Sequence, residues 1–309
     1  MIDFRHKTFL VLCDIGNYTR TAEHLHLTQP AVTQHIQYLE EKYDCKLFRY
    51  ENKRLTLTPE GEELRELLTR IAADASHFER NMQNREGVRE DVFFGATLSI
   101  GEYLMPRVII QILQENPKLN IHMEVANSQI LLEKLRKGEL DFALIEGVFD
   151  KSKYHSLLFS LERFIPVCAP DSLLAGRTVE FREVFQSTLV LREKGSGTRE
   201  IFENILRQYN YSLDSFQNII EIGNMAAIKK LVASNIGITF LYEIVAEQEI
   251  ERGELAVIDI AGLNIIREFN FVFLKDSAYT DKFTEYFRMM KKAASRLTWL
   301  TQKRSPGRS

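Results

Sequence analysis

The chain has 309 residues, of which 45% are hydrophobic, and a formal net charge of −3 at pH 7. This length is enough for two or three compact units, and the hydrophobic fraction supports sizeable cores. The slightly negative charge argues against a generally basic coat for nucleic acid, so attraction to phosphate must come from local basic patches or helix N-termini.

Two helices are predicted before residue 28. Apolar residues recur on one face of residues 3–15, as in a helix that packs on a core. Asn17 can cap a second, short helix over residues 18–25. His26 and Leu27 then make a tight turn. A short helix followed by a tight turn is the first half of a helix-turn-helix.

Residues 28–40 are predicted to form the recognition helix. Thr28 can cap it, and Pro30 lies in its first turn, where a missing N–H does little harm. A buried stripe with helical spacing is expected at Val32, Ile36 and Leu39. The other face carries polar side chains with both donors and acceptors, the groups that read base edges in a major groove. The expected base-contacting residues are Thr28, Gln29, Pro30, Thr33 and Gln34.

A two-stranded wing is predicted next, which completes a winged helix-turn-helix domain over residues 1–58. Leu47 and Phe48 precede a basic tip, and the residues after the tip alternate as in a strand. Phosphate contacts are expected from Arg49, Lys53 and Arg54. A generic small helical domain is the alternative, because helix-turn-helix patterns have many false positives.

These segments resemble the LysR-type transcriptional regulators. The likeness is carried by the run 17–36, by Leu39-Glu40 and Leu47-Phe48, and by residues 57–61, and it extends over nearly the whole chain. Gln34 stands where the family often has Arg, and Thr28 and Thr33 stand where Ser is commoner. The resemblance implies a homodimer that pairs into a homotetramer and binds double-stranded DNA near a promoter. It further implies activation of a neighbouring gene, with RNA polymerase as a further partner.

A linker helix is predicted over residues 59–88, because Thr58 can cap it and Pro59 suits its first position. Inside it, apolar residues alternate in steps of four and three, as in a heptad seam. The expected dimerisation residues are Leu64, Leu68, Ile71, Ala75, Phe78 and Met82. The alternative is a helix that lies on its own domain.

From residue 91 to 309, strands and helices alternate, which predicts α/β structure with mainly parallel sheets. We expect two lobes, as in periplasmic-type binding domains. The first lobe is predicted to contain residues 91–161 and 268–300, and the second residues 162–267, with a strand expected at 163–169. The predicted fold is therefore α/β with an N-terminal all-α winged helix-turn-helix and a two-lobed effector domain.

Polar residues follow several of these strands, where ligands of α/β folds bind against helix N-termini. Glycine N–H groups, hydroxyls and the charge of Arg199 favour a small anion, either a sulfur oxyanion or a small carboxylate. The expected effector-binding residues are Thr97, Ser99, Asn127, Ser128, Glu146, Gly195, Ser196, Gly197, Thr198 and Asn224. In the LysR-type family that the chain resembles, effectors bind in a cleft between the two lobes. Hydroxyl residues often contact them at the positions of Thr97, Ser99 and Thr198. Each hydroxyl is also compatible with a plain helix cap.

Glu146 complicates this prediction, because a carboxylate in an anion cleft repels the ligand. Three explanations are open. Glu146 is paired with Arg199 or Lys194, it is protonated, or it faces an amine of the ligand.

An enzyme is the main rival class. The chain has no GxSxG, no HExxH, no nucleotide loop and no close Cys–His pair, so no catalytic residue, metal or cofactor is expected. The alternative function is a solute-binding or enzymatic α/β domain fused to a DNA-binding module.

A cytoplasmic location is expected. The three cysteines, Cys13, Cys45 and Cys168, are far apart and lack metal-ligand spacing, which suggests reduced thiols. The N-terminus has charges inside its apolar run, unlike a signal peptide, and no apolar run approaches the length of a membrane span.

Overall fold

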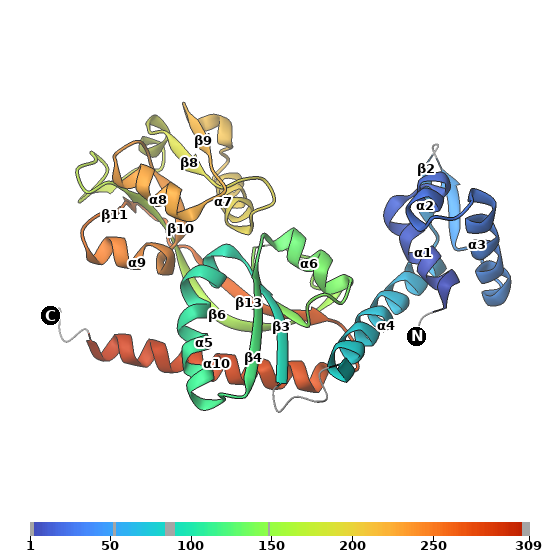
Figure 1. Cartoon of the computed structure of the whole chain (residues 1–309). Helices are drawn as coiled ribbons and strands as arrows, with labels where there is room; N and C mark the ends of the chain where they lie inside the picture. Colours follow the sequence, from blue (N-terminus) through green and yellow to red (C-terminus); the bar gives the residue numbers. More distant parts are fainter. Residues whose placement is uncertain (1–2, 52–53, 84–89, 148, 305–309) are drawn as a thin grey trace. The chain divides into compact units, whose positions relative to one another are not determined.

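Figure 1 shows a computed structural model of the chain, which describes residues 3–51, 54–83, 90–147 and 149–304. The chain divides into two compact units, one built mainly from the first 85 residues and the other mainly from the remainder. Each unit is described by itself. Within the described parts of the chain, none of the helices combines the length and the apolar character that a membrane span needs.

The N-terminal unit begins with three helices, α1 (Phe4–Ile15), α2 (Tyr18–Leu25) and α3 (Gln29–Tyr43). The caps are those that the sequence predicts. The side chain of Asn17 accepts the backbone N–H of residue 20 at 3.0 Å, and Thr28 accepts that of residue 31 at 3.3 Å. The predicted helix-turn-helix is therefore present, and its third helix continues three residues beyond the predicted end.

The wing is an antiparallel hairpin of β1 (Phe48–Glu51) and β2 (Arg54–Leu57). It leads into the long helix α4 (Pro59–Gln83), which begins at a cap. The hydroxyl of Thr58 accepts the N–H of Gly61 at 3.0 Å. The part of the predicted linker over residues 84–88 lies outside the described residues.

The core of the N-terminal unit is apolar and draws on most of these elements. Val32 of α3 is fully buried, as the predicted stripe requires. The remaining buried cluster joins α1, α3, α4 and the start of the wing, and consists of Phe9, Leu12, Ile36, Leu39, Leu47, Leu64 and Leu68. Burial of such side chains is the main stabilising term for so small a unit.

The C-terminal unit is built on one large mixed sheet. Its strands run in the order β10-β6-β13-β5-β3-β4, and β11 also pairs with β6. The parallel part contains β3 (Glu90–Ala96), β4 (Leu119–Val125) and β5 (Phe142–Glu146). Two long strands, β6 (Tyr154–Cys168) and β13 (Ile266–Leu274), run antiparallel to each other, and β13 is also antiparallel to β5.

The prediction of mainly parallel sheets is therefore wrong for the centre of this unit. The strand expected at 163–169 begins nine residues earlier, at Tyr154. Its first part alternates irregularly between buried and exposed residues, which gave no clear strand signal. Because β6 and β13 are long, they extend through both lobes and join them in a single sheet.

Shorter strands complete the second lobe. They are β7 (Thr178–Val179), β8 (Leu189–Leu191), β9 (Ile219–Glu221), β10 (Thr239–Tyr242), β11 (Ala256–Val257) and β12 (Asp259–Ile260). β8 and β9 are parallel, as are β7 and β12.

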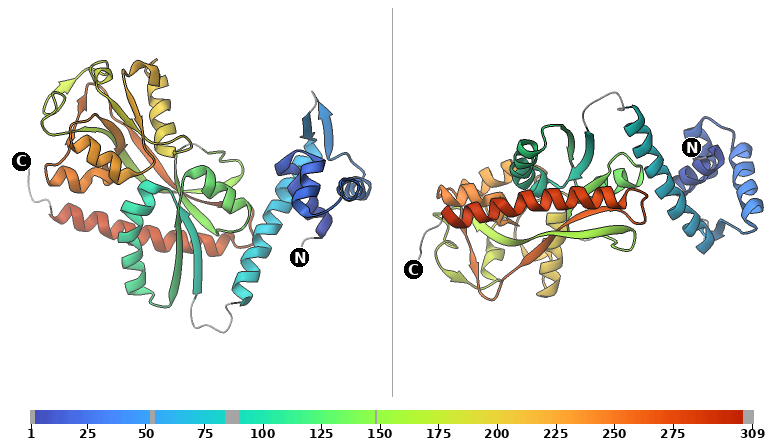
Figure 2. Two further views of the ribbon diagram at one scale, coloured as in Figure 1. Left: turned by 45° about the horizontal axis from the view of Figure 1, so that its top comes forward. Right: turned by 90° about the horizontal axis from the view of Figure 1, so that it is seen from below.

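Helices of this unit cover the sheets. They are the π-helical turn η1 (Ile100–Leu104), α5 (Met105–Glu115), α6 (Ser128–Arg136), the 3-10 turns η2 (Glu183–Gln186) and η3 (Leu213–Ser215), α7 (Gly197–Gln208), α8 (Met225–Ala233), α9 (Glu243–Glu251) and α10 (Thr280–Arg304). Figure 2 shows α10 lying along the first lobe. Its Phe283 and Phe287 make edge contacts with Phe273 and Phe271 of β13. β13 thus pairs with β5, and α10 packs on β13.

Candidate functional site

The polar face of α3 is presented to solvent. Thr28, Gln29, Pro30 and Gln34 are exposed, and Thr33 is half-buried. Gln29 donates to the hydroxyl of Thr33 at 3.0 Å, and that hydroxyl donates to the backbone oxygen of Gln29 at 3.1 Å. The two side chains therefore hold each other one helical turn apart. Such an exposed amide and hydroxyl pair can exchange its internal bond for base edges.

The wing places two of its three predicted phosphate-binding residues in solvent. Arg49 and Arg54 are exposed, whereas Lys53 lies outside the described residues. The guanidinium of Arg49 is 3.4 Å from the carboxylate of Glu51, and both side chains are more than half exposed. An exposed pair of this kind contributes little, so Arg49 can leave Glu51 for a phosphate.

The linker seam divides into two parts. Leu64 and Leu68 are buried in the core of their own unit, so their inclusion among residues that face a twin is wrong. The cause is that the first turns of α4 pack on α1 and the wing. Ala75 is half-buried. The exposed members of the seam are Ile71, Phe78 and Met82.

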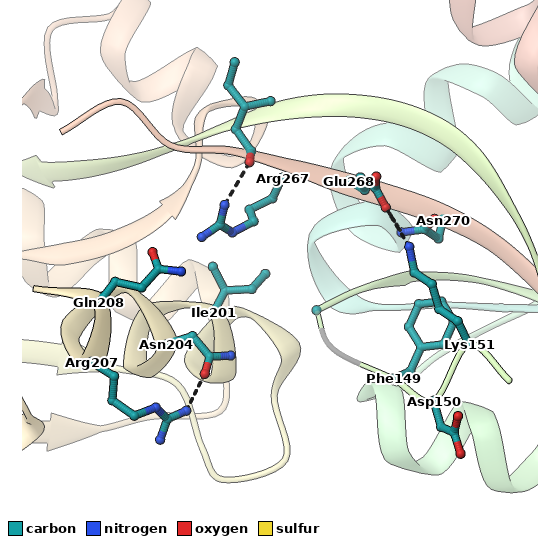
Figure 3. Close-up of a pocket in the computed structure, with 12 residues that line it drawn as sticks. Phe149, Asp150, Lys151, Ile201, Asn204, Arg207, Gln208, Arg267, Glu268 and Asn270 are labelled. Atoms are coloured by element: carbon teal, nitrogen blue, oxygen red, sulfur yellow. Dashed lines mark hydrogen bonds and ion pairs between the residues drawn. The ribbon is translucent and has the colours of Figure 1, made fainter.

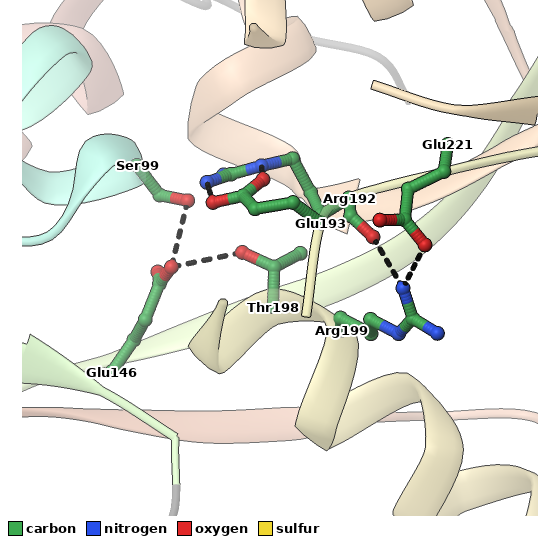
Figure 4. Close-up of polar contacts among 7 residues, drawn as sticks. All are labelled: Ser99, Glu146, Arg192, Glu193, Thr198, Arg199 and Glu221. Carbon is green, nitrogen blue, oxygen red and sulfur yellow. Dashed lines mark hydrogen bonds and ion pairs between the residues drawn. The ribbon is translucent and has the colours of Figure 1, made fainter. Parts of the chain in front are cut away.

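In the C-terminal unit, Glu146 lies where the lobes meet, at the end of β5. Its Oε1 accepts hydrogen bonds from Ser99 of the first lobe at 3.1 Å and from Thr198 of the second lobe at 2.8 Å (Figure 4). Ser128, the first residue of α6, donates to the backbone oxygen of Glu146 at 3.1 Å. Four of the predicted effector-binding residues thus form one hydrogen-bonded cluster.

Two glycines allow the lobes to approach this closely. A Cβ on Gly197 would lie 2.6 Å from the backbone oxygen of Glu146. Gly147 has a φ of +93°, and a Cβ there would lie 2.9 Å from the Cα of Gly197. Side chains at these positions would push α7 away from β5, so the contact depends on glycine at both.

Several buried polar atoms around this cluster have no hydrogen-bond partner among the described residues. They are Thr97 Oγ1, Ser196 Oγ, Glu146 Oε2, Arg192 Nη1 and Tyr242 OH. The five side chains are at most 4% exposed. Buried polar groups are nearly always paired, so a concentration of unpaired ones calls for an explanation, and a bound ligand is one.

Arg192 was missed by the sequence reasoning, which assigned the charge of this site to Arg199. Arg192 directly follows β8. Its Nε and Nη2 donate to the carboxylate of Glu193 at 2.7 and 2.8 Å, so that Nη1 has no partner among the described residues. Arg199 instead pairs with Glu203. It also pairs with Glu221 and donates to the backbone oxygen of Arg192 at 3.1 Å (Figure 4). The only sequence signal for Arg192 was that it directly follows a strand.

Neither of the predicted cations pairs with Glu146. Arg199 is occupied elsewhere, and Lys194 is exposed. Burial raises the pKa of Glu146 to about 7, against the hydrogen bonds from Thr198 and Ser99 and the charge of Arg192, which lower it. Protonated and ionised Glu146 therefore coexist near neutral pH.

Two predicted residues serve as helix caps. Asn127 accepts the N–H of residue 130 at 3.0 Å, and the exposed Asn224 accepts that of residue 227 at 2.9 Å. This cap bond of Asn224 does not join it to the Glu146 cluster. Gly195 has a φ of +86°, and a Cβ there would lie 3.6 Å from the side-chain nitrogen of Asn127. The glycine loop and the start of α6 thus face each other.

A hollow of about 930 Å³ begins at Gly147, next to the cluster. Figure 3 shows α7 on one side, with Asn204 and Arg207, and Lys151 on the other. Lys151 pairs with Glu268 at 3.0 Å. Within the described residues, no group of three or more His, Cys, Asp or Glu side chains is placed to hold a metal ion.

Comparison with known proteins identifies both units. Residues 5–62 match the bacterial regulatory helix-turn-helix protein, lysR family, and residues 85–295 match the LysR substrate binding domain. The chain is 26% identical to the transcriptional regulator CysL of Bacillus subtilis, over 86% of this chain and 89% of CysL.

Solved structures share the fold. A cysteine-to-serine mutant of OxyR from Corynebacterium glutamicum, with bound H2O2, superposes with a TM-score of 0.62 at 20% identity, over 97% of this chain and 94% of OxyR. The regulatory domain of Synechocystis CcmR in complex with 2-PG superposes with a TM-score of 0.58 at 22% identity, over 66% of this chain and 98% of that domain. The chain belongs to the LysR family of DNA-binding transcriptional regulators, and it is a regulator with a ligand-binding domain rather than an enzyme.

Proposed function

We propose that this regulator senses a small anion in the cleft around Glu146 and, in response, activates a neighbouring gene. The observation that carries the proposal is a group of buried polar atoms, contributed by both lobes, that have no hydrogen-bond partner in the part of the chain that the structure describes. A regulator of this kind works where the DNA is, in the cytoplasm, and contact with RNA polymerase is part of the proposal.

The DNA-binding part of the proposal rests on the exposed face of α3. Gln29, Pro30, Thr33 and Gln34 contact bases from the major groove, with Thr28 at the helix start. Phosphate contacts come from Arg49, Lys53 and Arg54. The exposed residues Ile71, Phe78 and Met82 pack on a second copy, and a pair of dimers forms a tetramer. Two recognition helices related by a two-fold axis read an inverted repeat.

The anion part rests on the donors in the cleft. Arg192 offers the two N–H bonds of its buried Nη1, Thr97 and Ser196 offer hydroxyls, and the first turn of α7 adds backbone N–H groups. Together these groups favour a sulfur oxyanion or a small carboxylate. The CcmR regulatory domain, which has the same fold, has been solved in complex with 2-PG.

The experiment measures thermal shifts of the full-length protein with sulfite, sulfate, phosphate, acetate and glycolate. Thr97→Val and Ser196→Ala each remove a buried hydroxyl without a partner, so the ligand-free melting temperature should hold or rise slightly. The anion-induced shift should fall. Thr21→Val is the matched control, because Thr21 carries an equally buried, unpartnered hydroxyl in the N-terminal unit.

Two results contradict the proposal. One is the absence of any shift with these anions. The other is an anion-induced shift that Thr97→Val, Ser196→Ala and Thr21→Val leave equally intact.

A further inference from the structure

The two oxygens of Glu146 have different surroundings. Oε1 receives both hydroxyl donors, from Ser99 and Thr198, whereas Oε2 is buried without a partner among the described residues. Among the described residues no cation forms an ion pair with the carboxyl, because Arg192 pairs with Glu193 and Arg199 with two other glutamates. Oε2 is therefore a free acceptor inside the cleft.

The other unpartnered atoms of the cleft are of the opposite kind. Arg192 Nη1 can only donate, and the hydroxyls of Thr97 and Ser196 are able to donate. A ligand held by these three groups presents acceptor oxygens to them. The same ligand meets an acceptor at Oε2, and two acceptors face each other unfavourably unless a proton lies between them.

We propose that Glu146 sets the specificity of the cleft by accepting a hydrogen bond from the ligand, an inference that rests on the proposed function. The cleft then takes anions that carry their own O–H or N–H donor, such as hydrogen phosphate, hydrogensulfite or glycolate. It rejects anions without one, such as sulfate and acetate. The residue is a specificity determinant and not a counter-ion.

The protonation of Glu146 sets the pH range of this selection. Burial raises the pKa of Glu146 to about 7, so in mildly acidic solution the side chain supplies the missing proton itself. Anions without a donor are then accepted. In mildly alkaline solution Glu146 is ionised, and the donor must come from the ligand.

Titratable and charged groups lie on the elements around Glu146. Arg192 after β8 and Tyr242 in β10 interact with its charge, and Arg267 in β13 and Glu162 in β6 interact with Tyr242. The neighbouring elements also carry Glu193, Arg199, Glu200 and Glu102. Arginine stays charged throughout the neutral range, and burial raises the pKa of Tyr242 well above its usual value. A Glu146→Gln variant isolates the contribution of Glu146 from those of the glutamates.

The experiment titrates the full-length protein by calorimetry with two matched pairs, phosphate against sulfate and glycolate against acetate, at pH 8.5 and pH 6. At pH 8.5 the donor-bearing anion should bind at least about tenfold more tightly than its partner, the effect of one unsatisfied buried group. At pH 6 the difference should largely disappear, because the affinity for sulfate and acetate rises.

The variants test the assignment to one residue. Glu146→Gln carries an amide donor at every pH, so sulfate and acetate should bind about tenfold more tightly to it than to the wild type at pH 8.5. Their binding should no longer depend on pH. Glu200→Gln is the control and should behave as the wild type, because Glu200 is exposed.

The outcomes separate this inference from the proposed function. If both members of each pair bind the wild type equally at pH 8.5, the inference is wrong and anion sensing stands. The same holds if Glu146→Gln leaves the selection unchanged. If none of the four anions binds at either pH, anion sensing itself is wrong, and the inference falls with it.

Discussion

The recognition helix and the ligand cleft use polar side chains in opposite ways. On α3, Gln29 and Thr33 lie at the surface and bond to each other. In the cleft, Thr97, Ser196 and Arg192 are buried and keep atoms without partners among the described residues. We expect the first surface to exchange these bonds only when DNA binds. Under the proposed function a ligand satisfies the polar groups around Glu146, so we expect this region to be less stable without a ligand and more responsive to one.

The largest effect is expected in the apolar core of the N-terminal unit. Leu68→Ala should lower the free energy of unfolding by about 2–5 kcal/mol, because Leu68 is buried in the core. The measurement is amide hydrogen exchange in α1 and α3, which should accelerate. Phe78→Ala is the control, since Phe78 is exposed. If Phe78→Ala accelerates exchange in α1 and α3 and Leu68→Ala does not, the assignment of Leu68 to the core and of Phe78 to the surface is wrong.

The stability of the C-terminal unit should depend on pH through the buried carboxyl of Glu146. The folded pKa of Glu146, about 7, is above its usual value of 4.5, so between these pH values the folded state binds more protons than the unfolded state. Stability is therefore lost as pH rises through this window, by on the order of 3 kcal/mol at pH 8.

Glu146→Gln removes that penalty. The melting temperature of the variant should exceed that of the wild type at pH 8 and match it near pH 4.5. Glu254→Gln, at an exposed position, provides the comparison. An equal difference at both pH values would show that Glu146 titrates normally.

A smaller effect is expected on base recognition. Gln34→Ala should reduce discrimination between operator and altered operator by roughly 1–3 kcal/mol, because an exposed Gln of α3 loses its base contact. Competition titrations on duplexes selected from a random pool measure this. Unchanged discrimination would mean that Gln34 does not reach a base.

The smallest effect is expected at the wing. Arg49→Ala should leave stability within about 1 kcal/mol, since its pair with Glu51 is exposed. It should weaken binding to all duplexes alike and reduce the slope of log K against log salt concentration by about 1. A loss confined to one operator sequence would contradict a phosphate role.

Local patterns account for what the sequence predicted well. The cap at Thr28, the buried stripe of Val32, Ile36 and Leu39, and the hairpin after them depend on neighbours a few residues away. The alternation of strands and helices in the C-terminal unit likewise follows from local patterns. The hydroxyls that meet Glu146 followed from their places after strands.

Long-range packing accounts for the features that the sequence did not predict. Whether Leu68 faces a twin or its own core depends on where α1 and the wing lie, which the heptad spacing does not encode. Likewise, Arg192 and Arg199 are each followed by a glutamate in the sequence. Only the folded structure shows that Arg199 pairs with Glu203 and Glu221, whereas Arg192 keeps a buried Nη1 without a partner among the described residues. The antiparallel return of β13 also depends on pairing between distant segments.

The ladder between β6 and β13 has one irregular step, between Phe269 and Asn270, and Phe269 pairs directly with Glu146 on β5. On both sides of that step the register is unbroken, which prevents the lobes from sliding along each other. We therefore expect any relative movement of the lobes to be a torsion near this step, beside Glu146. With Glu146 as the ligand-sensing residue that we propose, ligand binding and rotation of the lobes would act at the same place in the sheet.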